Sequence, residues 1–293
     1  MSPSSHISLV SRLRRPLAWL VIALVVAVGV AFLGDTFAAS RAEHRLAQAL
    51  QTSPTLTYEP EVTMSGTPFA TRAHTGDFPT VHVSARGASV GGCADRGACH
   101  VDVDAYLHDA ILGDVFTLEP QTPIRFGALK AETRIDSVNL GRLMNIVDLY
   151  INTPAPEGKV GGGGPGDGLL ERTDGIMLSG TVPLPGSPAK DGQYPPSAKE
   201  YRFPKVKVSV SANVSVADGR LRIEATKLYT GPEEHFSDDV PAEFNAAVLK
   251  LFSTTLPVVP LAWNTVPTRA FSRGSDMVLA GDTGGGTRTP ITY

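Results

Sequence analysis

The sequence predicts an α+β protein: a strongly curved antiparallel sheet wrapped on amphipathic helices, with an N-terminal transmembrane helix. Several long segments alternate apolar and polar residues with a period of two, which is the pattern of a strand with one buried face. Other segments carry apolar residues at helical spacing along one stripe. A charge-free run from Pro16 to Gly34 follows a basic flank. We see one set of core segments, and therefore expect one main domain.

The composition excludes some classes of partner. The 293 residues include 26 Lys or Arg and 29 Asp or Glu, which gives a net charge of -3. A chain without a basic excess has no electrostatic field to attract nucleic acid. Aromatic residues are scarce, at 7%, while Gly and Pro are frequent, at 29 and 23 residues. This composition indicates a β-rich protein with long loops.

The N-terminus predicts the compartment. Arg12, Arg14 and Arg15 precede the charge-free run, so residues 1–15 are expected to stay in the cytoplasm and residues 16–34 to form a single-pass signal anchor. The main domain then lies outside the cell membrane. A cleaved signal peptide is the alternative, because residues 36–39 offer small side chains for cleavage. The length of the run favours the uncleaved anchor.

Residues 35–280 are expected to form the extracytoplasmic domain. The expected elements, in chain order, are an amphipathic helix at 35–51, strands at 56–64, 80–88, 101–107 and 124–135, a helix at 136–151, a strand at 176–182, a hairpin at 204–229 and a helix at 239–252. Residues 69–78 read as a connector. The apolar phase slips between Ala128 and Leu129, which predicts a β-bulge. The Pro/Gly-rich loops at about 153–170 and 183–198 are expected to be flexible, and the tail at 281–293 disordered.

The hairpin is the strongest local prediction. From Val206 to Val216 every even position is apolar and every odd position is polar or small. Asp218-Gly219 follows, a dipeptide that accepts the positive φ angles of a two-residue turn. The return strand from Leu221 alternates in the same way. The apolar face of such a long hairpin needs a cover, because each buried valine contributes roughly 1.5–3 kcal/mol.

Few residues suggest chemistry. Cys93 and Cys99 are the only cysteines, and in an exported chain a close pair is most simply a disulfide. The polar residues His100, Asp102 and Asp104 share one strand face, where a hard cation could bind. A wet strand face is polar in any case, so we predict no metal site and keep this one as the alternative.

No nucleotide or catalytic motif is convincing. The string Gly161-x-Gly163-x-x-Gly166 matches a dinucleotide fingerprint, but no strand precedes it. Neither a Gly-x-Ser-x-Gly elbow nor a His-Glu-x-x-His motif occurs. We therefore predict a non-enzymatic protein without a cofactor.

Two stretches resemble a known family. They are Pro60-Glu-Val-Thr-Met-Ser-Gly-Thr-Pro-Phe-Ala-Thr and Gly76-Asp-Phe-Pro-Thr-Val-His-Val, and Leu256-Pro-Val-Val-Pro is also similar. The pattern resembles the LmeA-like phospholipid-binding proteins of actinobacterial cell envelopes, over roughly residues 39–281. The resemblance implies a fold similar to the tubular lipid-binding proteins, with an apolar channel, no catalytic site, and a role in envelope lipid or lipoglycan maturation.

We therefore expect an extracytoplasmic protein that holds the acyl chains of a phospholipid, of phosphatidylinositol type as one option, in an apolar channel. The candidate channel-wall residues are Phe69, Phe78, Val81, Val83, Ile124, Phe126, Leu143, Val147, Val206, Val208, Val210, Val214, Val216, Leu221, Ile223, Phe244, Val248, Phe252 and Trp263. One alternative is a structural or interaction module of the envelope with a solid core. A second is a glycolipid-modifying enzyme that uses His100 and Asp102.

Overall fold

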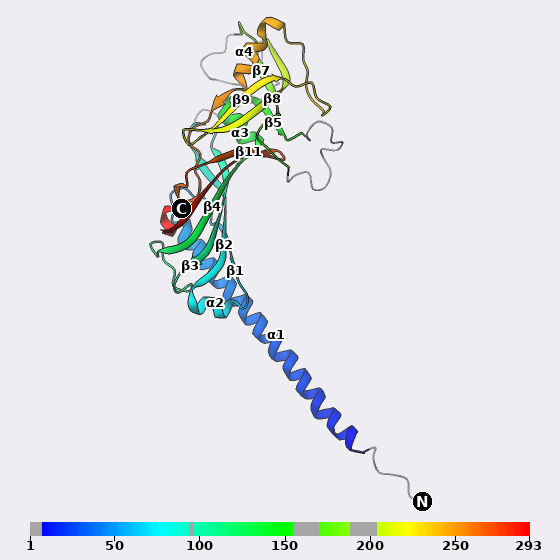
Figure 1. The fold of residues 1–293 in the computed structure, drawn as a ribbon, viewed down its shortest axis with the longest axis vertical. Helices are drawn as coiled ribbons and strands as arrows, with labels where there is room; N and C mark the ends of the chain where they lie inside the picture. Colours follow the sequence, from blue (N-terminus) through cyan, green and yellow to red (C-terminus); the bar gives the residue numbers. More distant parts are fainter. Residues whose placement is uncertain (1–7, 94–96, 155–169, 188–203) are drawn as a thin grey trace, which may run out of the picture.

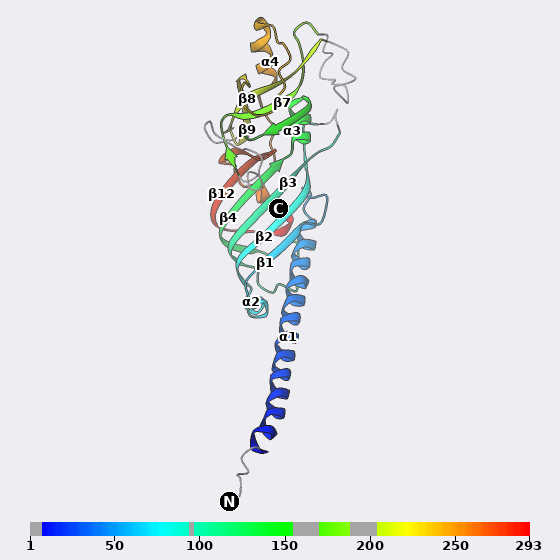
Figure 2. The same ribbon diagram turned by 90° about the vertical axis from the view of Figure 1, so that its right-hand side faces the viewer.

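The chain forms two antiparallel sheets that follow a long N-terminal helix (Figures 1 and 2). The structure is a computed structural model and describes residues 8–93, 97–154, 170–187 and 204–293. The fold is mixed α/β, and neither sheet closes on itself. The expectation of one sheet wrapped on helices is thus corrected, because the strands divide into a seven-stranded and a five-stranded sheet. The predicted loops at 153–170 and 183–198 lie mostly outside the described residues.

Helix α1 (Ser8–Gln51) has two different halves. From Trp19 to Phe37 its large apolar side chains are exposed, including Trp19 and Phe37 at 72% each. Beyond that point Ala42, Leu46 and Leu50 are fully buried. Among the described helices, α1 is the one that is long and apolar enough to cross a membrane, by length and composition. The structure therefore joins the predicted anchor and the predicted amphipathic helix in one continuous element.

The seven-stranded sheet pairs both ends of the folded region. Its strands, in spatial order, are β1 (Glu61–Ser65), β2 (Asp77–Val90), β3 (Cys99–Ile111), β4 (Ile124–Ile135), β12 (Asp276–Arg288), β11 (Arg269–Arg273) and β6 (Glu171–Arg172). The tail, expected to be disordered from residue 281, instead extends β12 along the whole of β4. Tyr293 is buried, and its hydroxyl donates to the carbonyl of Val103 at 3.2 Å. Pairing, rather than composition, orders this glycine-rich segment.

The expected bulge in β4 is absent. Ala128 and Leu129 pair in continuous register with β3 on one side and β12 on the other. The buried phase still slips in β4, because Phe126 and Leu129 are both buried. The same slip occurs at the same level in β3, where Asp109 has a φ of 51° and its carboxylate lies against Gly127. The pattern seen in the sequence is thus a change of buried face shared by neighbouring strands.

The five-stranded sheet contains the predicted hairpin. Its strands, in spatial order, are β10 (Thr254–Thr255), β9 (Arg220–Leu228), β8 (Lys205–Ala217), β7 (Ile176–Pro183) and β5 (Val147–Asn152). Asp218 and Gly219 have φ angles of 50° and 70°, which confirms the predicted two-residue turn. One register shift lies between Ser211 and Ala212, where β9 carries an extra residue.

Short helices lie between the strands. They are α2 (Phe69–Thr75), α3 (Ser137–Met144) and α4 (Asn245–Leu251), with single 3-10 turns at η4 (Ala242–Phe244), η5 (Ala262–Asn264) and η6 (Pro290–Thr292). The expected connector at 69–78 therefore contains a helix. Helix α3 leads from the seven-stranded to the five-stranded sheet. Asp136 caps α3 as predicted, by accepting from the backbone N–H of Asn139 at 2.7 Å. The helix ends at Met144 rather than at residue 151, because Asn145 adopts the left-handed conformation and residues 147–152 pair as β5.

One apolar cluster extends through the molecule. Buried residues of α1, of both sheets and of α4 belong to it. The C-terminus closes it beside α1, where Ser53 donates its hydroxyl to the carbonyl of Tyr293 at 2.8 Å. The Tyr293 ring meets Trp263 edge-on, with 4.8 Å between centroids. This cluster thus continues from the end of the fold beside α1 to its far end, while Phe271, Val278 and Ala280 form a second, smaller cluster.

Candidate functional site

Most of the predicted channel-wall residues contribute to this interior. Those with at most 6% exposure are Phe69, Phe78, Val81, Val83, Ile124, Phe126, Val206, Val208, Val210, Val214, Leu221, Ile223, Val248, Phe252 and Trp263. Leu143, Val216 and Phe244 are half-buried. Val147 begins β5, and its side chain lies outside what the structure describes. Most of the predicted wall residues therefore belong to one connected apolar cluster, which draws on both sheets.

The segment that contains α4 covers part of the even face of the hairpin, next to β9. Val248 and Phe252 are both fully buried in the same cluster as Val210. The segment also joins the sheet through its backbone, since Leu256 N–H donates to the carbonyl of Leu221 at 2.9 Å. The burial of Val248 and Phe252 explains the amphipathic pattern of residues 239–252.

Residues 229–238, which we call the strap, follow β9 along the same edge of β8, where Ser237 bridges to Val208. Ser209 and Phe236 exchange backbone contacts, since Ser209 N–H donates to the Phe236 carbonyl at 2.8 Å. Phe236 N–H in turn donates to the Ser209 hydroxyl at 3.0 Å. The hydroxyls of Ser209 and Ser179 are 2.6 Å apart, and both residues are buried. The two faces of β8 therefore differ: one is apolar, and the other is a small buried polar network.

An open pocket of about 670 Å³ lies where the two sheets meet. We call it the junction pocket, and its lining residues are 170–174 before β7, 214–216 of β8 and 268–271 of β11. Val214, Val216 and Phe271 supply apolar surface. The charged residues of the lining are Glu171, Arg172, Asp174 and Arg269. These arginines make long ion pairs, of 3.6 Å to Asp174 and 4.0 Å to Asp282. The pocket thus combines aliphatic side chains with cations that can donate further hydrogen bonds.

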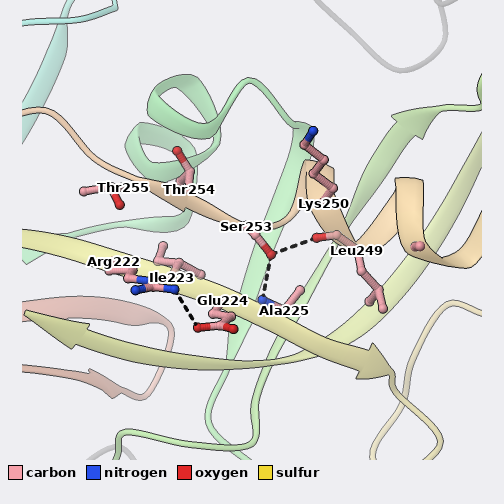
Figure 3. Close-up of a pocket in the computed structure, with 10 residues that line it drawn as sticks. Arg222, Ile223, Glu224, Ala225, Leu249, Lys250, Ser253, Thr254 and Thr255 are labelled. Carbon is pink, nitrogen blue, oxygen red and sulfur yellow. Dashed lines mark hydrogen bonds and ion pairs between the residues drawn. The ribbon is translucent and has the colours of Figure 1, made fainter. Parts of the chain in front are cut away.

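A second open pocket, of about 600 Å³, lies between β9, β10 and α4 (Figure 3). Ser253 connects its walls: the hydroxyl donates to the carbonyl of Leu249 at 2.9 Å and accepts from Ala225 N–H at 3.0 Å. Arg222 and Glu224 pair at 3.2 Å on its strand side. Ile223 is the predicted wall residue that lines this pocket. Its polar groups are largely satisfied by one another.

The weak metal candidates lie on the polar face of β3. His100 Nδ1 is 3.1 Å from the Gly87 carbonyl, and Asp102 accepts from Gly87 N–H at 3.3 Å. Asp104 lies 3.2 Å from His82 Nε2 and 3.3 Å from Arg134. Each group therefore already has a protein partner. Among the residues that the structure describes, no group of three or more His, Cys, Asp or Glu is placed to hold a metal ion.

Ion pairs and aromatic contacts extend along the same face. Arg273 lies between two carboxylates, at 2.9 Å from Glu132 and 2.6 Å from Glu171. The hydrogen bond with Glu132 is the largest cause of a raised pKa for Arg273. Tyr106 stacks on His82 with 4.3 Å between ring centroids, and burial raises the pKa of its phenol. These contacts lie on the polar face of the sheet, where the positive and negative side chains pair with one another.

Cys93 and Cys99 form a disulfide at the end of β3. Both are buried beside α3, where the Asn139 side-chain oxygen accepts from His100 N–H at 3.0 Å. The disulfide therefore closes the connection between β2 and β3, next to the helix that leads to the second sheet.

Sequence reasoning missed two features. The junction pocket depends on β11 meeting β8 from the other sheet, and no local pattern reveals that meeting. The second feature is Asp35, which accepts from the N–H groups of Phe69 and Ala70 at 2.9 and 2.7 Å. No local signal in the sequence indicated it, because residues 69–78 were expected to form a connector and not a helix with free N–H groups at its start.

Comparison with known proteins gives a single result. No curated protein and no solved structure matches the chain. A family model described as LmeA-like phospholipid-binding matches residues 33–282, which begin at the end of the exposed part of α1 and reach into β12. The chain belongs to the LmeA-like phospholipid-binding family.

Proposed function

We propose that this chain is a membrane-anchored, extracytoplasmic protein that holds phospholipid acyl chains against the even face of the β8–β9 hairpin. It would thereby support the maturation or transport of envelope lipids or lipoglycans. Its family is phospholipid-binding, which supports the ligand class. The observation that carries the placement is the junction pocket, where the predicted wall residues Val214 and Val216 reach an open volume.

The physical demand on such a site is large. A phospholipid with two chains exposes about thirty methylenes on leaving a bilayer, at about 0.8 kcal/mol each. A long apolar surface can offset that cost, and the connected interior offers one. Arg172 and Arg269 line the pocket and can donate to a phosphate group, which supports a headgroup at the pocket with the acyl chains inside.

The test uses the full chain in nanodiscs that contain a phospholipid with a photoactivatable diazirine on its acyl chain. After irradiation, mass spectrometry identifies the labelled peptides. Labelled peptides from the exposed half of α1 serve as the internal control for the membrane. We expect additional labelling within 205–217 and 220–228, and stronger labelling with phosphatidylinositol than with phosphatidylethanolamine.

A matched pair of variants makes the test specific. Val214→Asp places a carboxylate on the buried even face, whereas Asn213→Asp places one on the adjacent exposed position. We expect the first to abolish labelling of the hairpin and the second to preserve it. Equal labelling in both variants contradicts the placement of the acyl chains.

The second candidate is a structural or interaction module with a solid core. One observation favours it: Val206, Val208 and Val210 are at most 4% exposed, because other protein atoms cover them. Under this alternative only the peptides of α1 are labelled, in the unmodified chain as in both variants. The same experiment therefore separates the two functions.

A further inference from the structure

The segment 66–75, which contains α2, lies beside the point where α1 leaves the fold. Figures 1 and 2 both place α2 at the end of the fold from which the exposed half of α1 emerges. We call residues 66–75 the foot. The foot packs on the body through Phe69, which is buried with 5.5 Å between its ring centroid and that of Phe78. Its other residues Thr67, Pro68, Ala70, Thr71 and His74 are exposed.

A side chain of α1 binds the backbone at the start of α2 in the foot. The two carboxylate oxygens of Asp35 accept from Phe69 N–H at 2.9 Å and from Ala70 N–H at 2.7 Å. The first N–H groups of a helix have no partner within it, and a carboxylate also interacts favourably with that end of the helix dipole. Asp35 therefore acts as the N-cap of a helix that begins more than thirty residues later in the chain.

The position of Asp35 fixes the depth of the foot. The charge-free run from Pro16 to Gly34 is about 28 Å long as a helix, close to the roughly 30 Å thickness of a bilayer's hydrocarbon core. Asp35 follows directly, so it reaches the boundary between acyl chains and headgroups when the run spans the bilayer. Hydrogen bonds of less than 3 Å bring the start of α2 to the same level.

The surroundings of Asp35 fit lipid better than water. Phe37 lies beyond Asp35, the first charged residue after the apolar run, and yet it is 72% exposed. The foot itself contains no Asp or Glu, while it has Arg72 and His74. Arg72 keeps 41% of its side chain exposed and has a long contact of 3.9 Å with Asp77. A surface of this kind complements anionic headgroups.

We propose that the foot is a membrane-contacting surface: the exposed side of α2 lies in the headgroup layer of the bilayer that α1 crosses, with a preference for anionic phospholipid, and Asp35 is the residue that positions it. This proposal rests on the membrane anchoring proposed above and does not depend on lipid entering the core. Because α1 continues without a break from the apolar half into the fold, the foot has no linker that would let it leave this layer.

The test measures the depth of a fluorophore in the full chain in nanodiscs. Single cysteines replace Thr71 in the foot, Val26 in the exposed half of α1, or Val258, which is 72% exposed near β10. Cys93 and Cys99 are paired and do not react with a maleimide dye. Quenching is measured with nitroxide on the lipid headgroup and, separately, on the acyl chain.

We expect the headgroup nitroxide to quench the dye at position 71 and to leave position 258 bright, and the acyl-chain nitroxide to quench position 26. Adding phosphatidylglycerol to phosphatidylcholine discs should increase quenching at position 71. An unquenched position 71 beside a quenched position 26 overturns the foot and leaves the anchor in place. If quenching at position 71 does not change when phosphatidylglycerol is added, the proposed preference for anionic lipid is overturned. The photolabelling of the hairpin does not depend on the quenching at positions 71, 26 and 258, so the two proposals are tested separately.

The role of Asp35 is tested in the same discs. Asp35→Ala removes both acceptors, and we expect quenching at position 71 to be lost while quenching at position 26 is unchanged. Thr36→Ala is the matched control, because Thr36 is exposed and its hydroxyl donates to the Phe32 carbonyl within α1. Undiminished quenching in Asp35→Ala overturns the positioning role, and intact circular dichroism in both variants excludes unfolding as the cause.

Discussion

The buried serine pair beside the strap gives a prediction whose size follows from the contacts. Ser209 is 1% exposed, and its hydroxyl has two partners, the Ser179 hydroxyl at 2.6 Å and Phe236 N–H at 3.0 Å. Ser209→Ala leaves the Phe236 N–H and the buried Ser179 hydroxyl without these partners. A fully buried orphaned group costs about 1–3 kcal/mol, and the Phe236 N–H costs less because Phe236 is 45% exposed, so we expect a loss of about 2–4 kcal/mol in the free energy of unfolding.

Ser179→Ala should cost less, about 1 kcal/mol, because the Ser209 hydroxyl can still accept from Phe236 N–H. In the double variant the Ser179 hydroxyl is gone, so only the Phe236 N–H is left without a partner. We therefore expect the double variant to lose less than the sum of the single losses, by about 2–4 kcal/mol, because it has neither the orphaned Ser179 hydroxyl nor the separate Ser179→Ala loss.

Urea unfolding of the full chain in detergent micelles, followed by far-ultraviolet circular dichroism, measures the three losses. Hydrogen exchange adds a local reading, since the Phe236 amide should lose protection in both variants that lack the Ser209 hydroxyl. Photolabelling of the hairpin should persist, because Ser209 lies on the face opposite to Val210. Additive losses, or a Ser179→Ala loss as large as that of Ser209→Ala, would refute the reasoning.

Three further predictions concern other parts of the fold. Replacing Cys93 and Cys99 together by Ser should lower the free energy of unfolding by about 2 kcal/mol, the chain-entropy value for so short a loop, as measured by urea unfolding against the oxidised chain. Burial raises the folded-state pKa of Glu43 above its usual 4.5, so its ionised form opposes folding. Glu43→Gln should therefore match the unmodified chain in stability below pH 4.5 and exceed it as the pH rises through the raised pKa, and equal stabilities at neutral pH would contradict this. Gly76→Ala should cost about 1–2 kcal/mol from its left-handed φ of 68° alone, and more because the new methyl would meet the Gly113 carbonyl, whereas the unhindered Gly219→Ala measures the cost of the angle by itself.

The sequence predicted those elements whose pattern is local. The alternation in β8 and the Asp218-Gly219 turn fixed the hairpin to within a residue or two, because both the strand period and the turn geometry depend on adjacent residues. The N-cap of α3 was found for the same reason. Its end was not, since residues 147–151 satisfy a helical and a strand pattern alike, and pairing with β7 decided between them.

Long-range pairing accounts for the remaining differences. The segment from Gly281 to Arg288 has poor strand propensity, and only its position beside β4 makes it a strand. The division into two sheets likewise depends on which strands pair, and an alternating pattern does not indicate the neighbour of a strand. The candidate wall was foreseen as buried side chains, whereas the junction pocket required two strands from different sheets.

The unbroken course of α1 has a consequence for transport. Under the proposed topology no hinge separates the span from the body, so the protein has one fixed reach and cannot swing between membranes. It searches for donors and acceptors only by diffusing in the plane of its own bilayer. Any lipid that crosses a wider gap must then be passed to a second carrier that comes within range of the junction pocket.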